Sequence, residues 1–264
     1  VNSFANSGNG RVAVVAAGNE GNEFIHVSGS VSAASTESIT ITVPSFSNTS
    51  GAGNDYFSFE LWWNNDDDVT ATVLSPSSTY SYTRTDGQTG TFPSDHGSIY
   101  LENTTDSDHS NGHKRTYVRV EDSVDGTGPE IGDWTLQLTN NSNDAMTYHA
   151  WLYASSLGST PAYATVAGGD STYTIASPGT ADSAITVGSF SGRWRYTDRN
   201  TITRSAGSPD LSDDIADFSS MGPTRDGRQK PDICASGEGL ITSTSTDYTP
   251  DSDEDIIENT YHFV

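Results

Sequence analysis

One stretch of the chain, residues 12–22, places a side chain suited to catalysis at the end of a run of very small residues. Asn19 follows Ala-Ala-Gly, and that run closes a short apolar segment at 12–15. A side-chain amide donates hydrogen bonds without carrying a titratable charge, so it suits an oxyanion that forms only in a transition state. Asn19 is therefore a candidate oxyanion donor. A buried strand that ends in an ordinary Gly-Asn turn is the alternative interpretation.

The apolar segment 12–15 must position that amide. Four consecutive apolar residues predict a strand buried on both faces of a parallel sheet. Ala16, Ala17 and Gly18 then remove side-chain bulk, which lets a ligand or another backbone approach the main chain. Ligands of open α/β sheets bind beyond the carboxyl ends of the strands, so we expect Asn19 to face a binding site. Residues 1–10 are predicted to be the tail of a helix.

From residue 23 the sequence changes to short runs in which apolar and polar residues alternate, separated by Gly, Pro, Asn, Asp and Ser. This pattern predicts an antiparallel β-sandwich, and about eight short strands favour a jelly roll. We expect Trp134 and Trp151 to be core residues. Exposed aromatic residues that could bind carbohydrate or a substrate tail are the alternative function of this region, and the candidates are Trp62, Trp63, Tyr80 and Tyr82. The predicted strands are 36–43, 56–63, 69–74, 78–84, 97–102, 114–121, 133–139 and 147–154.

Three ordered segments carry a family signature: VVAAGNEGN at 14–22, YTIASPGTADSAITVGSFS at 173–191, and DFSSMGPTRDGRQKPDICASG at 217–237. Together they resemble the corresponding segments of the subtilisin-like serine proteases, the subtilases (peptidase family S8). The run at 129–153 is similar to the closing part of jelly-roll domains that accompany many subtilases. The resemblance implies an α/β fold with a parallel sheet, incomplete in this chain and interrupted by an inserted all-β jelly roll. The expected divisions are 1–22 and 168–264 for the subtilase domain and 23–167 for the insert.

The resemblance also implies roles for individual residues. Asn19 matches the catalytic asparagine of the oxyanion hole, and Phe218 matches a residue on the leaving-group side of the cleft. Ala176 matches a position beside the S1 pocket, where many relatives have Gly, so we expect a slightly shallower, apolar pocket. A cis Ser177-Pro178 bond would fit a tight turn there. The facing wall of the pocket is assigned to Ala16, Ala17 and Gly18.

The catalytic triad of the family is not visible in this sequence. No histidine stands in a His-Gly-Thr context and no Gly-Thr-Ser-Met occurs. We therefore expect the chain to be part of a larger serine endopeptidase, and to be inactive by itself. A β-sandwich binding module of a catalytically inactive homologue is the alternative, and a purely structural or adhesive domain is a third hypothesis. Cys234 is interpreted as an inert core thiol rather than a nucleophile.

Composition excludes several classes of partner. The 264 residues contain 12 Lys and Arg against 35 Asp and Glu, a net charge of -23. Nucleic acids and anionic membranes are excluded as partners because no basic surface can neutralise phosphates. One cysteine rules out an intramolecular disulfide. The composition, rich in Ser, Thr, Asn, Asp and Gly and poor in Lys, is typical of an exported protein, so we predict an extracellular location. An ordinary soluble acidic protein is the alternative. The resemblance to the subtilases implies a polypeptide as the substrate.

No cofactor is required by this interpretation, and calcium is left open as a structural ion. Several acidic clusters offer the hard oxygen ligands that calcium prefers, with solvated loops as the alternative. The cluster at 251–255 begins like an EF-hand loop but has Ile256 at the position of the required Gly. The other clusters are 65–68, Asp106 with Asp108, and Asp122 with Asp125. The oligomeric state, the natural substrate and the role of the insert are not predicted.

Overall fold

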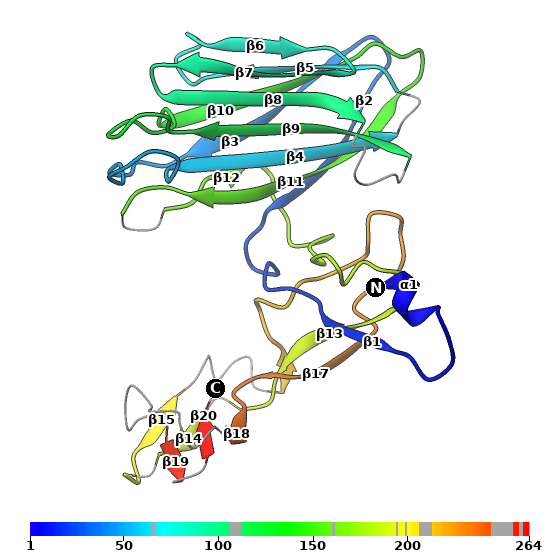
Figure 1. Ribbon diagram of the computed structural model, residues 1–264, viewed down its shortest axis with the longest axis vertical. Coiled ribbons are helices and arrows are strands. Elements are labelled where there is room, and N and C mark those ends of the chain that lie inside the picture. Colours follow the sequence, from blue (N-terminus) through cyan, green and yellow to red (C-terminus); the bar gives the residue numbers. More distant parts are fainter. Residues whose placement is uncertain are drawn as a thin grey trace. The chain divides into compact units, whose positions relative to one another are not determined.

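The computed structural model describes residues 1–64, 67–105, 112–159, 162–193, 195–198, 200–205, 213–243, 256–258 and 261–263. The chain divides into two compact units (Figure 1). Unit 1 consists of Val1–Glu23 and Ser171–Val264, and unit 2 is Phe24–Asp170. Unit 2 therefore lies in the sequence between the two stretches of unit 1.

Unit 2 is built from two antiparallel sheets, which Figure 1 shows lying one behind the other. The five-stranded sheet has the order β12-β3-β10-β5-β6 and the six-stranded sheet the order β2-β11-β4-β9-β8-β7. The strands are β2 His26–Val31, β3 Thr36–Val43, β4 Tyr56–Asn64, β5 Val69–Leu74, β6 Ser81–Arg84, β7 Gln88–Ser94, β8 Gly97–Thr105, β9 His113–Glu121, β10 Gly132–Asn140, β11 Met146–Ser156 and β12 Thr165–Val166.

A single hydrophobic core joins the two sheets of unit 2. Alternate residues point into it, as the period of two predicts: Phe57, Phe59 and Leu61 of β4 are fully buried. Partners from the other sheet include Ile39 and Ile41 of β3. The predicted antiparallel strands are confirmed. The structure adds β2, β7 and β12, which the sequence pattern missed because they are short or rich in Ser, Thr and Gly.

The division of the aromatic residues of unit 2 between buried and exposed positions differs from the prediction. Trp134 is buried, as predicted. Trp151 is only half-buried and does not belong to the core cluster, and its ring centroid lies 6.0 Å from that of His149. The prediction of exposed aromatic residues is wrong for Trp62 and Trp63, which are buried. Tyr80 and Tyr82 are half-buried and pack against the core. Trp62 and Trp63 are successive residues of β4, so their side chains point to opposite faces of the sheet, and both are nevertheless buried. The residue type alone therefore did not predict exposure.

Unit 1 is organised around β13 (Ala184–Ser191), which pairs in parallel with β1 (Ala13–Ala16) and, on its other side, with β17 (Ile233–Glu238). A short strand β16 (Asp214–Ile215) pairs antiparallel with the end of β13. The helical tail predicted at the start is present as α1 (Asn2–Ala5). The remaining strands form a hairpin, β14 (Arg195–Thr197) with β15 (Thr203–Ser205), and a small sheet of β18 (Ile241–Ser243), β19 (Ile256–Glu258) and β20 (Tyr261–Phe263).

Two expectations about burial in unit 1 are wrong. The strand at 12–15 is not buried on both faces, because Val12 and Val14 are 56% and 60% exposed. Cys234 of β17 is an exposed free thiol rather than a core residue. Both strands border β13 on one side only, and within the described residues α1 is the sole helix, with 4 residues. No described helix is long and apolar enough to cross a membrane.

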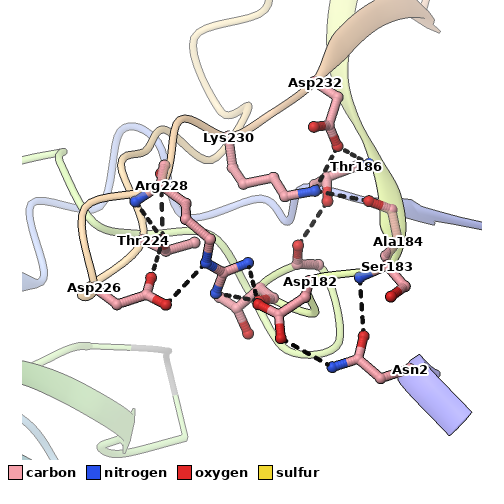
Figure 2. Close-up of polar contacts among 12 residues, drawn as sticks. Asn2, Asp182, Ser183, Ala184, Thr186, Thr224, Asp226, Arg228, Lys230 and Asp232 are labelled. Carbon is pink, nitrogen blue, oxygen red and sulfur yellow. Dashed lines mark hydrogen bonds and ion pairs between the residues drawn. The ribbon is translucent and has the colours of Figure 1, made fainter.

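A polar network fastens the segments of unit 1 to one another (Figure 2). The buried Lys230 ammonium donates to the Ala184 carbonyl at 2.7 Å and to Asp232 Oδ2 at 2.6 Å. Asp232 Oδ2 also accepts the Thr186 amide at 2.7 Å. The segment before β17 is thereby tied to the start of β13. Such charge-assisted hydrogen bonds are among the stronger polar contacts in proteins.

A second part of the network centres on the Arg228 guanidinium (Figure 2). Arg228 Nε donates to Asp226 Oδ2 at 2.8 Å, and Nη1 lies 2.9 Å from Asp182 Oδ1. Asn2 of α1 donates to the other oxygen of Asp182 at 3.4 Å and accepts the Ser183 amide at 2.9 Å. The carboxylates of Asp182 and Asp226 therefore connect α1, the loop before β13 and the turn before β17.

This network makes the stability of unit 1 sensitive to acid. The hydrogen bond from Lys230, with that from the Thr186 amide, holds the pKa of Asp232 below its ordinary value. Arg228 and Thr224 lower the pKa of Asp226 in the same way. A carboxyl group with a lowered folded-state pKa stabilises the fold above its unfolded pKa of about 4, and that stability is lost as the pH falls through the folded pKa. We therefore expect the melting temperature of unit 1 to fall as the pH is lowered from about 5.

Differential scanning calorimetry from pH 7 to pH 3 measures this dependence. The double variant Asp226→Asn, Asp232→Asn should melt lower at pH 7 and show a flatter acid limb. Asp217→Asn is the control, because Asp217 is exposed and its carboxylate accepts no hydrogen bond within the described residues. An acid limb as steep in the double variant as in the unchanged chain would contradict the assignment.

Candidate active site

Three segments far apart in the sequence meet at the carboxyl end of β1. The Ala17 amide donates to the Val187 carbonyl at 2.9 Å, which continues the pairing of β1 with β13. The Ala17 carbonyl accepts the Ala176 amide at 2.8 Å. The Gly18 carbonyl accepts the Ser220 amide at 3.0 Å. The structure therefore brings together the segments 14–22, 173–191 and 217–237, which were singled out separately in the sequence.

Glu20 and Ser220 close the turn that follows β1. The Ser220 hydroxyl donates to Glu20 Oε2 at 2.6 Å and accepts the Glu20 amide at 3.1 Å. One residue further on, the Gly21 amide donates to the Phe218 carbonyl at 2.8 Å. Ser220 is buried, so these hydrogen bonds are shielded from water. The turn at 18–21 is fixed to the segment 218–220 at both of its ends.

Two glycines in this turn are required by close contacts. Gly18 has φ +119°, in the region that other residues rarely adopt, and a Cβ there would lie 2.6 Å from Ser220 Oγ and 2.9 Å from Ala176 Cβ. A Cβ on the buried Gly21 would collide with the Ser219 carbonyl and lie 2.8 Å from the Asp217 carbonyl. The Ala-Gly-Asn-Glu-Gly sequence therefore fits a turn that other segments enclose tightly.

Asn19 is the exposed member of this enclosed turn. Its neighbours Gly18 and Glu20 are held by Ser220, whereas its own side chain makes no hydrogen bond within the described residues. A carboxamide on a fixed backbone with an uncommitted N–H can donate to an anion that arrives from solvent. The geometry therefore gives Asn19 the properties of a hydrogen-bond donor toward a ligand.

The other predicted site residues lie around the same turn. Ala17 is buried and Ala16 exposed at the end of β1, while Ala176 is half-buried opposite Ala17 and Gly18. The Ser177-Pro178 bond that follows Ala176 is cis. Phe218 is half-buried and reaches the turn through its carbonyl. The roles of these residues toward a substrate stay predictions.

Glu20, Ser220 and Thr174 take part in the site without having been predicted from the sequence. Thr174 joins two of the segments, since its amide donates to the Met221 carbonyl at 2.8 Å and its Oγ1 accepts the Met221 amide at 2.9 Å. All three residues stand inside the segments that resemble subtilases, and this location was the one sequence feature that could have pointed to them. The pairing of Glu20 with Ser220, two hundred residues apart, has no local pattern that could have revealed it.

The described residues do not complete an acyl-transfer site around Asn19. Histidines occur at 26, 96, 109, 113, 149 and 262, so none lies in 1–23 or 171–261. His26, in unit 2, is fully buried and holds Asp170 at 3.0 Å and His149 at 2.9 Å. Burial lowers the pKa of His26, although the Asp170 carboxylate opposes that shift. His26, Asp170 and His149 all belong to unit 2.

Comparison with known proteins settles the family. The profile of the Subtilase family (Peptidase_S8) matches residues 109–259, more than half of the chain. The chain belongs to the subtilase family. The resemblance predicted from the three sequence segments is thereby confirmed.

Relatives of this subtilase chain are matched over short stretches. It is 44% identical over 77 residues to the serine protease AprX of Bacillus subtilis, covering 29% of this chain and 15% of that protein. It is 40% identical over 96 residues to the uncharacterized protein aq_aa18 of Aquifex aeolicus, covering 36% of this chain and 39% of that protein. The chain thus spans well under half the length of these relatives.

A solved structure shares the fold of the subtilase chain. The CspB protease of Clostridium perfringens superimposes with a TM-score of 0.63 over 96% of this chain and 44% of that protein. The identity is 20%, so this likeness concerns the fold alone.

Proposed function

We propose that this chain is part of a secreted subtilisin-like serine endopeptidase that hydrolyses peptide bonds through an acyl-enzyme. The observation that carries the proposal is the meeting of the segments 14–22, 173–191 and 217–237 around the exposed amide of Asn19. In this function Asn19 donates a hydrogen bond to the oxyanion of the tetrahedral intermediate. The segments that bear the Asp, His and Ser of the triad belong to the remainder of the enzyme.

The pocket for the P1 side chain follows from the same arrangement. Ala16, Ala17 and Gly18 form one wall, and Ala176 faces them with a methyl group. Such walls offer an apolar, shallow surface without a charge that could pair with a basic or acidic P1 residue. We propose small or apolar P1 residues as substrates, with Phe218 on the leaving-group side.

Unit 2 is proposed to be a jelly roll inserted into the subtilase domain. Its antiparallel sheets and hydrophobic core support a sandwich, and its place at Phe24–Asp170 separates the segment 14–22 from the segment 173–191 in the sequence. Secretion is supported by the acidic, Lys-poor composition, with 35 Asp and Glu among 264 residues. We propose no cofactor for the hydrolytic step.

The complete enzyme provides the test. It should cleave peptide substrates with small or apolar P1 residues, and a fluorophosphonate should label one serine and abolish cleavage. The 264-residue chain alone is the control, and it should neither cleave nor be labelled. A complete, folded protein that shows neither labelling nor cleavage would contradict the proposal and favour a β-sandwich binding module on an inactive homologue.

A further inference from the structure

Two loops of unit 2, residues 48–55 and 122–126, are fastened to each other by main-chain and side-chain hydrogen bonds. The Gly53 amide donates to the Asp122 carbonyl at 3.0 Å, and the Asp122 amide donates to the Asp55 carbonyl at 3.0 Å. Asn48 Nδ2 donates to the Gly126 carbonyl at 2.6 Å, and the Gly51 amide donates to Asp125 Oδ1 at 2.7 Å. The two loops therefore form one small structure that is rich in oxygen atoms.

The carboxylate of Asp122 is buried in this structure with one oxygen unpartnered. Asp122 is 1% exposed, and its Oδ1 accepts the Asp55 amide at 3.1 Å, which directs the carboxylate into the 48–55 loop. Its Oδ2 is buried and has no hydrogen-bond partner. Asn54, on the facing loop, donates through Nδ2 to the Ser50 carbonyl at 2.8 Å, and its Oδ1 is likewise buried without a partner.

The neighbouring Asp55 shows how a buried carboxylate is satisfied by protein groups alone. Asp55 is fully buried, and its two oxygens accept the Thr49 amide at 2.7 Å, the Thr49 hydroxyl at 2.9 Å and the Gly158 amide at 2.6 Å. No Lys, Arg or His forms an ion pair with Asp122 among the described residues. Buried charges in proteins are paired or coordinate metals, and an orphaned buried oxygen calls for a water or an ion.

We propose that the 48–55 and 122–126 loops bind a divalent cation of the calcium type, with Asp122 Oδ2 and Asn54 Oδ1 as ligands. Carboxylate and amide oxygens are the hard donors that calcium takes, and loops tolerate its flexible geometry better than the strict octahedron of magnesium. The exposed Asp125 adds a second negative charge next to the loop. The cation neutralises the buried Asp122 charge and joins the two loops.

The donor set predicts a weak site. Within the described residues no three or more His, Cys, Asp and Glu side chains are arranged to hold a metal, so backbone carbonyls and water must complete the six to eight ligands of calcium. Sites of extracellular modules bind calcium with dissociation constants of about 10⁻⁴ to 10⁻³ M, and we expect this site in that range. The predicted acidic clusters at 106–108 and 251–255, and residues 65 and 66 of another, lie outside the described residues.

Calcium titration of the full chain tests the site. The chain is first treated with EDTA, and the melting transition of unit 2 is followed by calorimetry as CaCl₂ is added, with MgCl₂ in parallel. We expect the transition to rise and to saturate at millimolar calcium, with a smaller response to magnesium. Isothermal titration of the same protein measures binding directly. The absence of both a calcium-dependent shift and a binding heat would overturn the proposal.

Variants locate the cation. Asp122→Asn keeps an oxygen that can accept the Asp55 amide but removes the charge, so it should abolish the calcium-dependent shift, and Asn54→Ala should reduce it. Asp144→Asn is the matched control, because Asp144 is an exposed loop residue of the same unit. A calcium response in Asp122→Asn equal to that of the unchanged chain would overturn the site. If Asp122→Asn does not fold, Asn54→Ala and the isothermal titration decide. Neither readout depends on proteolysis, so the result is separate from the proposed function.

Discussion

We expect Asn19→Ala to lower kcat of the complete enzyme about 100- to 1000-fold. Asn19 is exposed on a turn whose backbone is held by Ser220 on both sides, so the backbone that carries its amide is fixed before negative charge develops on the substrate. A preorganised donor of this kind stabilises the transition state without reorganisation at the moment of reaction. The magnitude is taken from loss of one oxyanion donor in a member of this family, which is the known example of the effect.

The effect of Asn19→Ala should fall on kcat and leave KM nearly unchanged. In the proposed role the amide contacts the oxyanion rather than the ground-state carbonyl, so its loss would remove stabilisation of the transition state alone. Steady-state kinetics on a peptide substrate measure both constants. Asn22→Ala is the control, because Asn22 is an exposed amide of the same loop. An unchanged kcat in Asn19→Ala would remove Asn19 from the oxyanion hole.

The largest expected loss of stability comes from Trp134→Ala in unit 2. The Trp134 ring is 1% exposed and meets Phe57 edge to face at 5.6 Å between centroids, so it fills the space between the two sheets. Its Nε1 donates to the Glu130 carbonyl at 2.8 Å. Truncating a buried Trp to Ala costs about 3–5 kcal/mol, because the contacts are lost and a cavity remains. Trp134→Phe keeps an aromatic ring and should cost less.

Chemical denaturation of the full chain, followed by far-ultraviolet circular dichroism, measures this loss in the transition of unit 2. Tyr153→Ala serves as the control, because Tyr153 stands on the same sandwich but is 65% exposed. Substitutions at exposed positions of that kind usually change stability by about 0.5 kcal/mol or less. A loss below about 1 kcal/mol in Trp134→Ala would contradict its place in the core.

Much of unit 2 was predictable because the alternation of apolar and polar residues along a strand indicates which face is buried. Phe57, Phe59 and Leu61 stand at every second position, and the same period marks β3 and β5. Strands without that contrast were missed: β2 reads His-Val-Ser-Gly-Ser-Val, and it takes its place by pairing with β11. The exposure of Tyr153 follows the same period, since Leu152 before it is buried, but the register shift between Leu152 and Ala154 interrupts the pairing with β4, and no local pattern reveals it.

By itself the sequence determined the family and the segments that make the candidate site, with Asn19 among them, because short ordered stretches of residues carry this information. The role of Asn19 toward a substrate stays a prediction. The tertiary structure alone decided how those stretches meet. Glu20 and Ser220 form hydrogen bonds across two hundred residues, and Val14 and Cys234 are exposed although their strands look apolar. The physical reason is that hydrophobicity gives the tendency of a residue to leave water, whereas burial also requires another element to cover it.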